Sequence, residues 1–174
     1  MKSFRIFIAL FAVVPFLVSF SLFKGFEKRI DREIRDEFNV ATYTNTGIAV
    51  SKDLQQKLPS KVTAENFFRI KNNDKLLGYV YLDQAPSKTA EFDYLIIFDK
   101  DLKIGRTKVL VYREEYGGEI GSKRWLSQFK GKSKASELDN IAAISGATIS
   151  VRSMKMAVKN ILESVEIMQQ NNLL

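Results

Sequence analysis

Residues 66–112 contain four runs that have the composition and alternation of β-strands, and the connections between these runs are short. The strand-like runs are residues 66–71, 76–82, 92–98 and 104–112. Asn, Asp and Pro residues mark the turns between them, at residues 72–74, 85–89 and 99–101. Because a parallel crossover needs a dozen or more residues, these strands must pair antiparallel. This constraint predicts one antiparallel sheet.

An amphipathic helix at the C-terminal end of the chain supplies a cover for that sheet. Its apolar residues recur at helical spacing, at Val151, Met154, Val158, Ile161, Val165 and Met168. We therefore predict an α+β fold in which an antiparallel sheet packs against helices. The length of 174 residues fits one domain with a substantial core.

A single N-terminal transmembrane helix is predicted to precede this fold. Residues 6–23 are uncharged and almost wholly apolar, which is close to the minimum length for spanning a bilayer. Pro15 would kink this helix without preventing insertion. A cleavable signal peptide is the alternative, since residues 19–21 form a small-x-small site. The flanking charges only slightly favour export of the body.

Residues 24–41 are densely charged and carry one narrow apolar stripe. Phe26, Ile30, Ile34 and Phe38 recur every fourth residue, which predicts an amphipathic surface helix. This helix either packs on its own domain or binds a partner. The chain thus divides into a membrane anchor or signal peptide (1–23), a charged helix (24–41) and a main domain (42–174). Residues 42–61 are polar, and we predict an irregular segment there with a short helix near residues 53–57.

The composition excludes several kinds of chemistry. The chain has neither cysteine nor histidine, which removes disulfides, thiolate or imidazole metal sites and histidine-assisted nucleophiles. Redox chemistry would therefore need an organic cofactor. The net charge of +7 comes from mixed charges without the interleaved aromatic residues of a nucleic-acid binder, so we predict no nucleic-acid partner. No catalytic group and no metal site is predicted.

Small residues precede the last helix, in the run Ser145-Gly146-Ala147-Thr148-Ile149-Ser150. Such residues let a phosphate approach the backbone at the positive end of the helix dipole, and Thr148 adds a hydroxyl there. The simpler interpretation is that Ser145 or Ser150 caps the helix. Both interpretations stay open on local sequence alone.

A glycine-rich loop, residues 113–121, follows the last predicted strand. Its three glycines, Gly117, Gly118 and Gly121, permit positive φ angles and close approach of a planar ligand, and Tyr116 could stack on one. The alternative is an ordinary turn beside core aromatic residues. Adjacent residues in an extended chain point to opposite faces, so Glu114 and the next glutamate are not expected to act as an acid–base pair.

Several of these segments, taken in order, resemble the FMN-binding domain family. The matching segments are Gly78-Tyr79-Val80, residues 99–104, the Tyr112–Gly118 loop, residues 125–132 and residues 144–150. Members of this family include the G subunit of Rnf complexes, the C subunit of the sodium-pumping NADH:quinone reductase and NosR-type regulators. The resemblance covers residues 75–165.

The resemblance implies a covalently bound FMN. In that family a flavin transferase attaches FMN through its phosphate to the threonine of the Ser-Gly-Ala-Thr motif, which is Thr148 here. From the resemblance and the local sequence together, we expect the following residues to bind the cofactor: Ser145, Gly146, Ala147, Thr148, Ser150, Glu114, Tyr116, Gly117 and Gly118. The Glu114–Gly118 loop would lie near the isoalloxazine ring.

The same resemblance implies a bacterial membrane protein with one N-terminal span and its body on the extracytoplasmic side. Its expected partners are a flavin transferase, the membrane, and a membrane redox complex or another electron carrier. We expect an electron carrier rather than an enzyme that turns over a substrate.

One position departs from the family pattern. The family has aspartate three residues before the motif serine, and this chain has Ala142. A non-covalently bound FMN, or a flavin-free interaction module tethered to the membrane, is therefore the alternative function. A flavin-using enzyme is the least favoured hypothesis, because no substrate pocket is evident in the sequence.

Overall fold

A computed structural model describes residues 25–174 and shows a single five-stranded antiparallel sheet in the order β1-β2-β3-β4-β5. The strands are β1 (Thr44–Gly47), β2 (Phe67–Asn72), β3 (Lys75–Pro86), β4 (Glu91–Asp99) and β5 (Ile104–Val111). The helices are α1 (Glu27–Phe38), α2 (Lys52–Gln55), α3 (Lys123–Leu126) and α4 (Thr148–Gln170). The described part also contains the short 3₁₀ helices η2 (Gly118–Gly121), η3 (Ser127–Phe129) and η4 (Ala135–Leu138). The predicted anchor, residues 1–23, lies outside the described residues.

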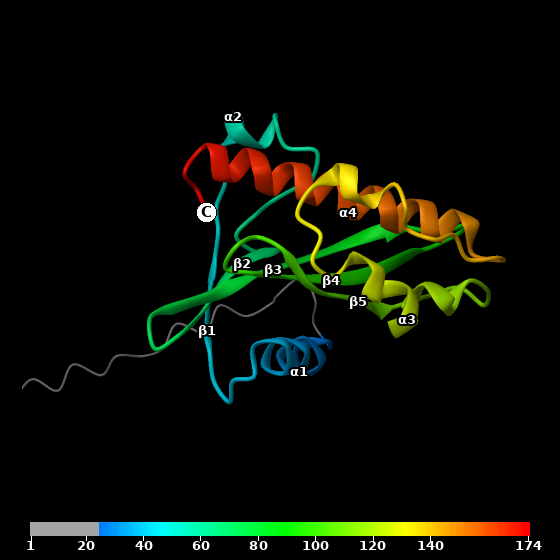
Figure 1. Cartoon of the computed structure of the whole chain (residues 1–174), viewed down its shortest axis with the longest axis horizontal. Coiled ribbons are helices and arrows are strands. Elements are labelled where there is room, and N and C mark those ends of the chain that lie inside the picture. The colour runs from blue at the N-terminus through cyan, green and yellow to red at the C-terminus, as the bar shows by residue number, and fades with distance from the viewer. Residues whose placement is uncertain (1–24) are drawn as a thin grey trace, which may run out of the picture.

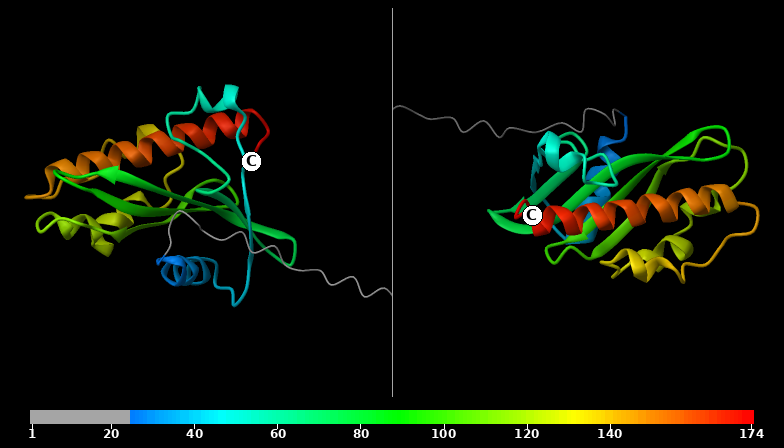
Figure 2. Two further views of the ribbon diagram at one scale, coloured as in Figure 1. Left: turned by 180° about the vertical axis from the view of Figure 1, so that it is seen from behind. Right: turned by 90° about the horizontal axis from the view of Figure 1, so that it is seen from above.

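The molecule has three layers, with the sheet in the middle (Figures 1 and 2). The long helix α4 runs across one face of the sheet, and α1 lies against the opposite face. The view from above in Figure 2 shows α4 crossing the strands obliquely, with α3 beside it. The antiparallel α+β class predicted from the sequence is confirmed.

Alternate residues of the central strands face the two different cores. In β3, Tyr79 and Tyr81 pack under α4, whereas Val80 and Leu82 pack under α1, and each of the four is at most 3% exposed. A strand that is apolar on both faces is typical of a sheet covered on both sides. The apolar residues predicted along the last helix are all buried in the larger core.

Two local predictions were wrong. Residues 44–47 were placed in the irregular segment 42–61, but they form β1, which pairs with β2. Their polar composition gives no strand signal, because β1 is a short edge strand whose side chains are largely exposed. Pro86 was placed in a loop but is the last residue of β3, a position where its missing N–H is tolerated.

The stripe predicted on the charged helix packs on the protein's own sheet. Ile30 and Ile34 are fully buried, and Phe26 and Phe38 contact the same core. This outcome confirms the first of the two interpretations of that helix. Within residues 25–174, no helix combines the length and the apolar character that crossing a bilayer requires.

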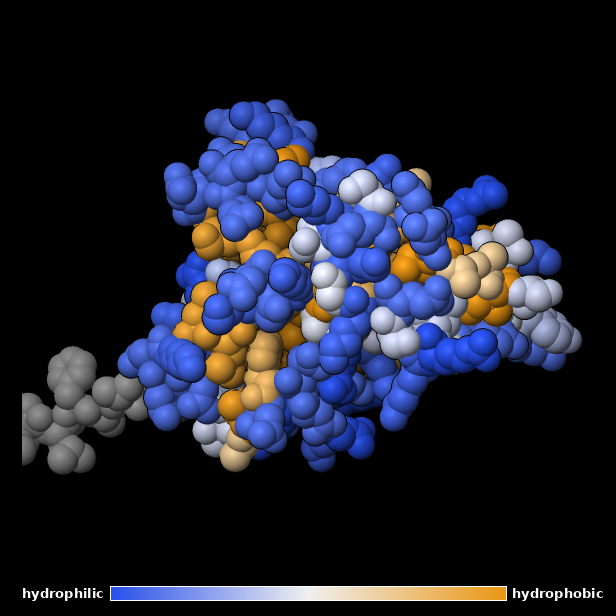
Figure 3. All heavy atoms as spheres, viewed as in Figure 1, coloured by the Kyte–Doolittle hydropathy of each residue, from blue (hydrophilic) through white to orange (hydrophobic). Residues whose placement is uncertain are grey.

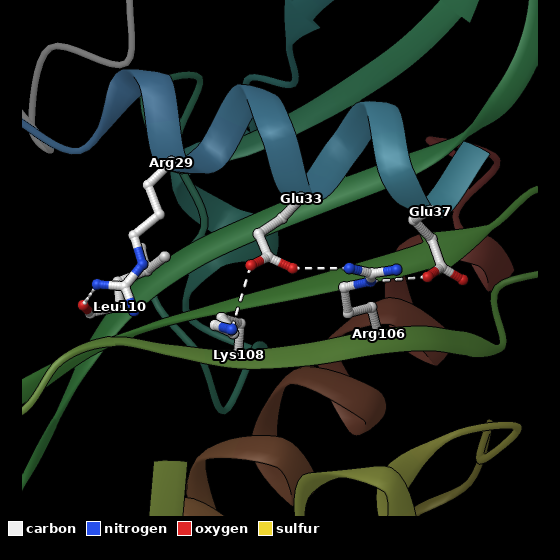
Figure 4. A network of polar contacts seen from close by, with 6 residues as sticks. All are labelled: Arg29, Glu33, Glu37, Arg106, Lys108 and Leu110. Carbon is white, nitrogen blue, oxygen red and sulfur yellow. Dashed lines mark hydrogen bonds and ion pairs between the residues drawn. The ribbon is translucent and has the colours of Figure 1, made fainter. Parts of the chain in front are cut away.

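Ion pairs reinforce the packing of α1 against β5 (Figure 4). Glu33 Oε2 lies 2.7 Å from Arg106 Nη1, and Glu33 Oε1 lies 3.2 Å from Lys108 Nζ. Glu37 accepts from Arg106 Nε at 2.8 Å. The Arg29 guanidinium donates to the carbonyl of Leu110 near the other end of the strand. These contacts fix α1 along the edge strand.

The pH dependence of stability tests this network. Burial opposes the charge of Glu33, but hydrogen bonds from Arg106 and Lys108 outweigh it and hold its pKa below the ordinary 4.5. A lowered folded-state pKa adds stability above about pH 4.5 that is lost as the pH falls through the folded-state value. Urea unfolding across a pH series should therefore show that Glu33→Gln costs most stability near neutrality and progressively less in acid.

Glu163→Gln on α4 is the matched control, because Glu163 makes only a 3.9 Å surface pair with Lys159. It should change stability little at any pH. A Glu33→Gln penalty that stays constant from neutral to acid pH would contradict the assigned network.

Candidate functional site

Helix α4 begins at Thr148 without a side-chain cap. Its N-cap residue is Ala147, whose methyl group cannot accept a hydrogen bond. Ser145 is exposed and makes no capping bond, and the Ser150 hydroxyl lies 2.9 Å from the Tyr112 hydroxyl instead. The interpretation of either serine as the helix cap was therefore wrong.

The missing cap leaves backbone donors at the start of the helix. Within residues 25–174, the N–H groups of Thr148, Ile149 and Ser150 donate to no protein acceptor. The first intrahelical bond runs from the Val151 N–H to the Ala147 carbonyl, at 2.9 Å. Unpaired amides and the helix dipole together favour an anion at this point. The side chain of Thr148 is exposed beside them.

The Tyr112 hydroxyl joins the glycine-rich loop to this helix end. It donates to the Tyr116 carbonyl at 2.9 Å, and because that uses its single proton, the Ser150 hydroxyl donates to Tyr112. Gly117 lies against the same group: a Cβ on Gly117 would be 2.6 Å from the Tyr112 hydroxyl and 3.5 Å from the Ala147 Cβ. The structure thus brings Tyr116 and Gly117 next to the Ser-Gly-Ala-Thr segment.

Glu114 is directed elsewhere. Its carboxylate accepts from the Ser87 hydroxyl and from the N–H groups of Thr89 and Ala90, at 2.6 and 3.2 Å. These bonds, that of Ser87 first, hold the pKa of Glu114 below its ordinary value. Its neighbour Arg113 bonds to Asp93 of β4. The start of the loop is therefore fixed to the β3–β4 hairpin rather than aimed at the start of α4.

The outer side of this region is unusually apolar. Tyr116 is 76% exposed and Ile149 is 51% exposed. Gly118, the first residue of η2, is also exposed. Figure 3 shows apolar atoms at the end of the molecule where the loop after β5 meets the start of α4. Gly146, with φ of +83°, has no atom within 4 Å of the position of a Cβ. A planar ring can reach the backbone here without displacing a side chain.

A cavity of about 360 Å³ extends along α4 from Thr148. Arg152, Lys155 and Lys159 line it from the helix, and η4 forms its other wall. The Lys155 ammonium donates to the Ile141 carbonyl at 3.2 Å, whereas Arg152 is exposed. These cations were not singled out in the sequence, although they recur at helical spacing after Thr148. They add positive charge next to the free amides.

The segment before the motif is held by two side chains. Trp125 Nε1 donates to the Ala142 carbonyl at 2.7 Å, and the Ala142 N–H donates to Gln128 Oε1 at 2.9 Å. Trp125 is 4% exposed and packs edge-on against Phe129, with ring centroids 5.2 Å apart. Both aromatic rings therefore belong to the core, and the main chain of Ala142 is fixed while its methyl group is exposed.

Comparison with known proteins shows what this region resembles. Residues 89–163 match the model of the FMN-binding domain family, and this span contains β4, β5, the glycine-rich loop and the start of α4. Over these residues the chain is therefore similar to FMN-binding domains. The chain also resembles the crystal structure of Shewanella oneidensis NqrC, with a TM-score of 0.49, 18% identity, and coverage of 72% of this chain and 68% of that chain. No curated protein matches the sequence.

The family that matches residues 89–163 is named for binding FMN. The residues at the start of α4 fit its phosphate, because three free amides, one exposed hydroxyl and nearby cations form a donor set for a phosphate. The exposed apolar surface at Tyr116 and Ile149 fits a flavin ring.

The contact between the loop and the helix end can be tested through Gly117. Gly117 and Gly131 have φ angles of +87° and +80°, so alanine at either costs about 1–2 kcal/mol of backbone strain. Only at Gly117 does the new methyl group meet another atom, the Tyr112 hydroxyl at 2.6 Å. Gly117→Ala should therefore destabilise the protein by about 1–3 kcal/mol more than Gly131→Ala in urea unfolding.

Removing the obstructing hydroxyl should recover part of that difference. In a Tyr112→Phe background, the penalty of Gly117→Ala is expected to approach that of Gly131→Ala. Equal penalties for the two alanine substitutions in the wild-type background would show that the hydroxyl does not abut Gly117.

Proposed function

We propose that this protein is a membrane-anchored, extracytoplasmic flavoprotein that carries FMN covalently on Thr148 and relays electrons in a membrane-associated redox chain. The observation that supports this proposal most strongly is the uncapped start of α4 inside an FMN-binding domain. Three free amides converge there with the exposed Thr148 hydroxyl.

The covalent step would form a phosphate ester at the hydroxyl oxygen of Thr148. The Thr148 hydroxyl oxygen would attack the FMN phosphorus of a flavin dinucleotide, and the P–O bond between the two phosphates would break. The nucleoside monophosphate would leave with the Thr148 proton, and the protein would gain the mass of FMN less one water. A flavin transferase is the partner that would carry out this transfer. In the product, the amides of Ile149 and Ser150 would hold the phosphate oxygens, and Arg152 lies one helical turn further along.

The loop would set the surroundings of the isoalloxazine ring, which supplies the redox chemistry of the bound cofactor. Tyr116 and Gly117 are adjacent to the motif, and the Tyr112 hydroxyl holds them there. Glu114 stays bonded to the β3–β4 hairpin, so it would support the loop rather than exchange protons with a substrate. This arrangement favours an electron carrier over an enzyme with its own substrate.

The helix α1 and the candidate flavin site lie on opposite sides of the sheet. The apolar residues 6–23 lead into α1, which covers the face opposite α4. A protein tethered through α1 could therefore present the start of α4 to a membrane redox complex or another electron carrier. The proposed location is a bacterial cell membrane, with one span and the body outside the cytoplasm.

Intact-mass measurement tests the covalent linkage. Full-length protein co-produced with a flavin transferase should gain the mass of one FMN less one water, and Thr148→Ala should abolish this gain. Thr148→Ser keeps a hydroxyl and should keep at least part of it. Thr46→Ala, at an exposed threonine of β1, is the matched control and should be fully modified.

Two results would contradict the proposal of a covalent linkage. One is an unmodified wild-type protein in a host whose transferase modifies a second FMN-binding protein produced beside it. The other is a mass gain that survives Thr148→Ala.

Non-covalent binding of FMN is the second candidate, and Ala142 is the observation that favours it. If an acid at this position helps the transferase to recognise its target, Ala142→Asp should raise the rate of flavin attachment several-fold. The exposed side chain and fixed main chain of Ala142 would present the new carboxylate to solvent.

Ala143→Asp provides the matched control, because Ala143 is exposed and adjacent. It should leave the attachment rate near that of the wild type. The same rate for both variants and the wild type would remove any role for an acid at position 142.

A further inference from the structure

The strand β5 forms one edge of the sheet, and among residues 25–174 only partners at its two ends bond to its outer side. At its start, the Ile104 N–H donates to the Lys132 carbonyl at 2.8 Å and the Ile104 carbonyl accepts from Gly131 at 2.7 Å. Near its end, the Leu110 carbonyl accepts from Arg29 of the segment that forms α1. The middle of the edge lies between these two closures.

The hydrogen-bond alternation of the sheet shows which groups in the middle face outward. The Asp99 N–H donates to the Lys103 carbonyl across the β4–β5 turn, so the backbone groups of Asp99 face β5. Because this direction alternates along a strand, the backbone groups of Ile97 and Leu95 also face β5. Their partners in β5 are Arg106 for Ile97 and Lys108 for Leu95. The residues between and after these partners, Thr107 and Val109, therefore turn their N–H and C=O groups away from the sheet.

Those outward groups have no partner within residues 25–174. The Thr107 side chain adds a further unpaired group, and Thr107 is only 7% exposed. Its Oγ1 is the single buried side-chain nitrogen or oxygen atom of the described part without a hydrogen-bond partner. Buried polar atoms are nearly always hydrogen-bonded, so an unsatisfied hydroxyl beside unpaired backbone groups points to a missing ligand.

A groove gives access to this edge. Its first part is a cavity of about 260 Å³ between α1 and α3, lined by residues 105–108 of β5 and by Glu33, Lys123 and Lys130. A second hollow continues from Lys108 to Tyr112, and both are lined by Lys108 and Gly121. The groove therefore runs along the outer edge of β5 from Gly105 and ends at the glycine-rich loop. Figure 4 shows the α1 side of this groove.

The charge of the groove indicates the chemistry of its occupant. Glu33 and Glu37 are already neutralised by Arg106 and Lys108. Lys123 and Lys130 are exposed on the α3 side and pair with no acid in the described part of the chain. A second copy of this protein would place like charges against them, whereas an acidic chain would complement them.

We propose that a partner protein adds an acidic, extended segment to β5 as a sixth strand of the sheet. Main-chain hydrogen bonds to Thr107 and Val109 supply the affinity, and carboxylates facing Lys123 and Lys130 supply the selectivity. This docking needs no FMN, but it brings the partner to the loop beside the flavin site. An exposed strand edge that stays unpaired would otherwise be open to unwanted pairing.

Binding of a synthetic peptide to the full-length protein in detergent micelles tests this proposal. The probe is a capped octapeptide of alternating glutamate and valine, and titration calorimetry measures its Kd. N-methylation of alternate residues along one edge of the peptide should weaken binding at least tenfold, while methylation along the other edge should change it little. That asymmetry is specific to strand addition, because only one edge of an added strand faces β5.

Charge selectivity is tested with matched variants. Lys123→Glu/Lys130→Glu should weaken binding of the acidic peptide at least tenfold, and Lys52→Glu/Lys57→Glu, the same change on or just after the distant α2, should not. Thr148→Ala should leave peptide binding unchanged, which separates this proposal from that of covalent FMN.

Three outcomes would overturn the proposal. They are no binding at millimolar peptide, equal weakening by both methylation patterns, and equal affinity for a peptide of alternating lysine and valine. Concentration-dependent dimerisation that blocks the peptide would assign the edge to a second copy and would equally overturn it.

Discussion

The start of α4 is the constraint on which the rest of the site depends. A 23-residue helix normally satisfies its first amides with a capping side chain, but here the N-cap is an alanine. The donors therefore face outward beside the Thr148 hydroxyl. The Tyr112 hydroxyl holds the glycine-rich loop against the same point, and Gly117 permits this close contact because it lacks a Cβ. The free amides favour an anion such as a phosphate, and the Tyr112 contact keeps the loop beside it.

The sheet separates three surfaces. The helix α1 and its ion pairs cover one face, α4 covers the other, and the outer edge of β5 lies between them. A tether through α1, a cofactor at the start of α4 and a partner strand on β5 would occupy different surfaces. Because the groove on β5 ends at Tyr112, a docked partner would lie next to the loop at the candidate flavin site.

Much of the fold could be predicted because it depends on local patterns. Short turns required antiparallel pairing, and helical spacing placed Val158 and Ile161 in the core. The strand β1 escaped prediction because its position comes from pairing with β2 and not from its own polar residues. At the site, the family resemblance predicted that the motif and the loop both contact FMN, and this stays a prediction. It could not show that Glu114 bonds to the β3–β4 hairpin or that Tyr112 joins the loop to Ser150, because both contacts depend on tertiary structure.

The state of the phosphorus atom tests the central claim most directly. Phosphorus NMR of native, folded protein matured with a flavin transferase can distinguish a phosphodiester from a monoester. A monoester titrates with a pKa of about 6, whereas a diester at Thr148 has no such second ionisation. Our account predicts one resonance whose position is constant from about pH 5 to about pH 8. A resonance that shifts through that range and leaves with the small molecules on unfolding would contradict it, as would the absence of phosphorus.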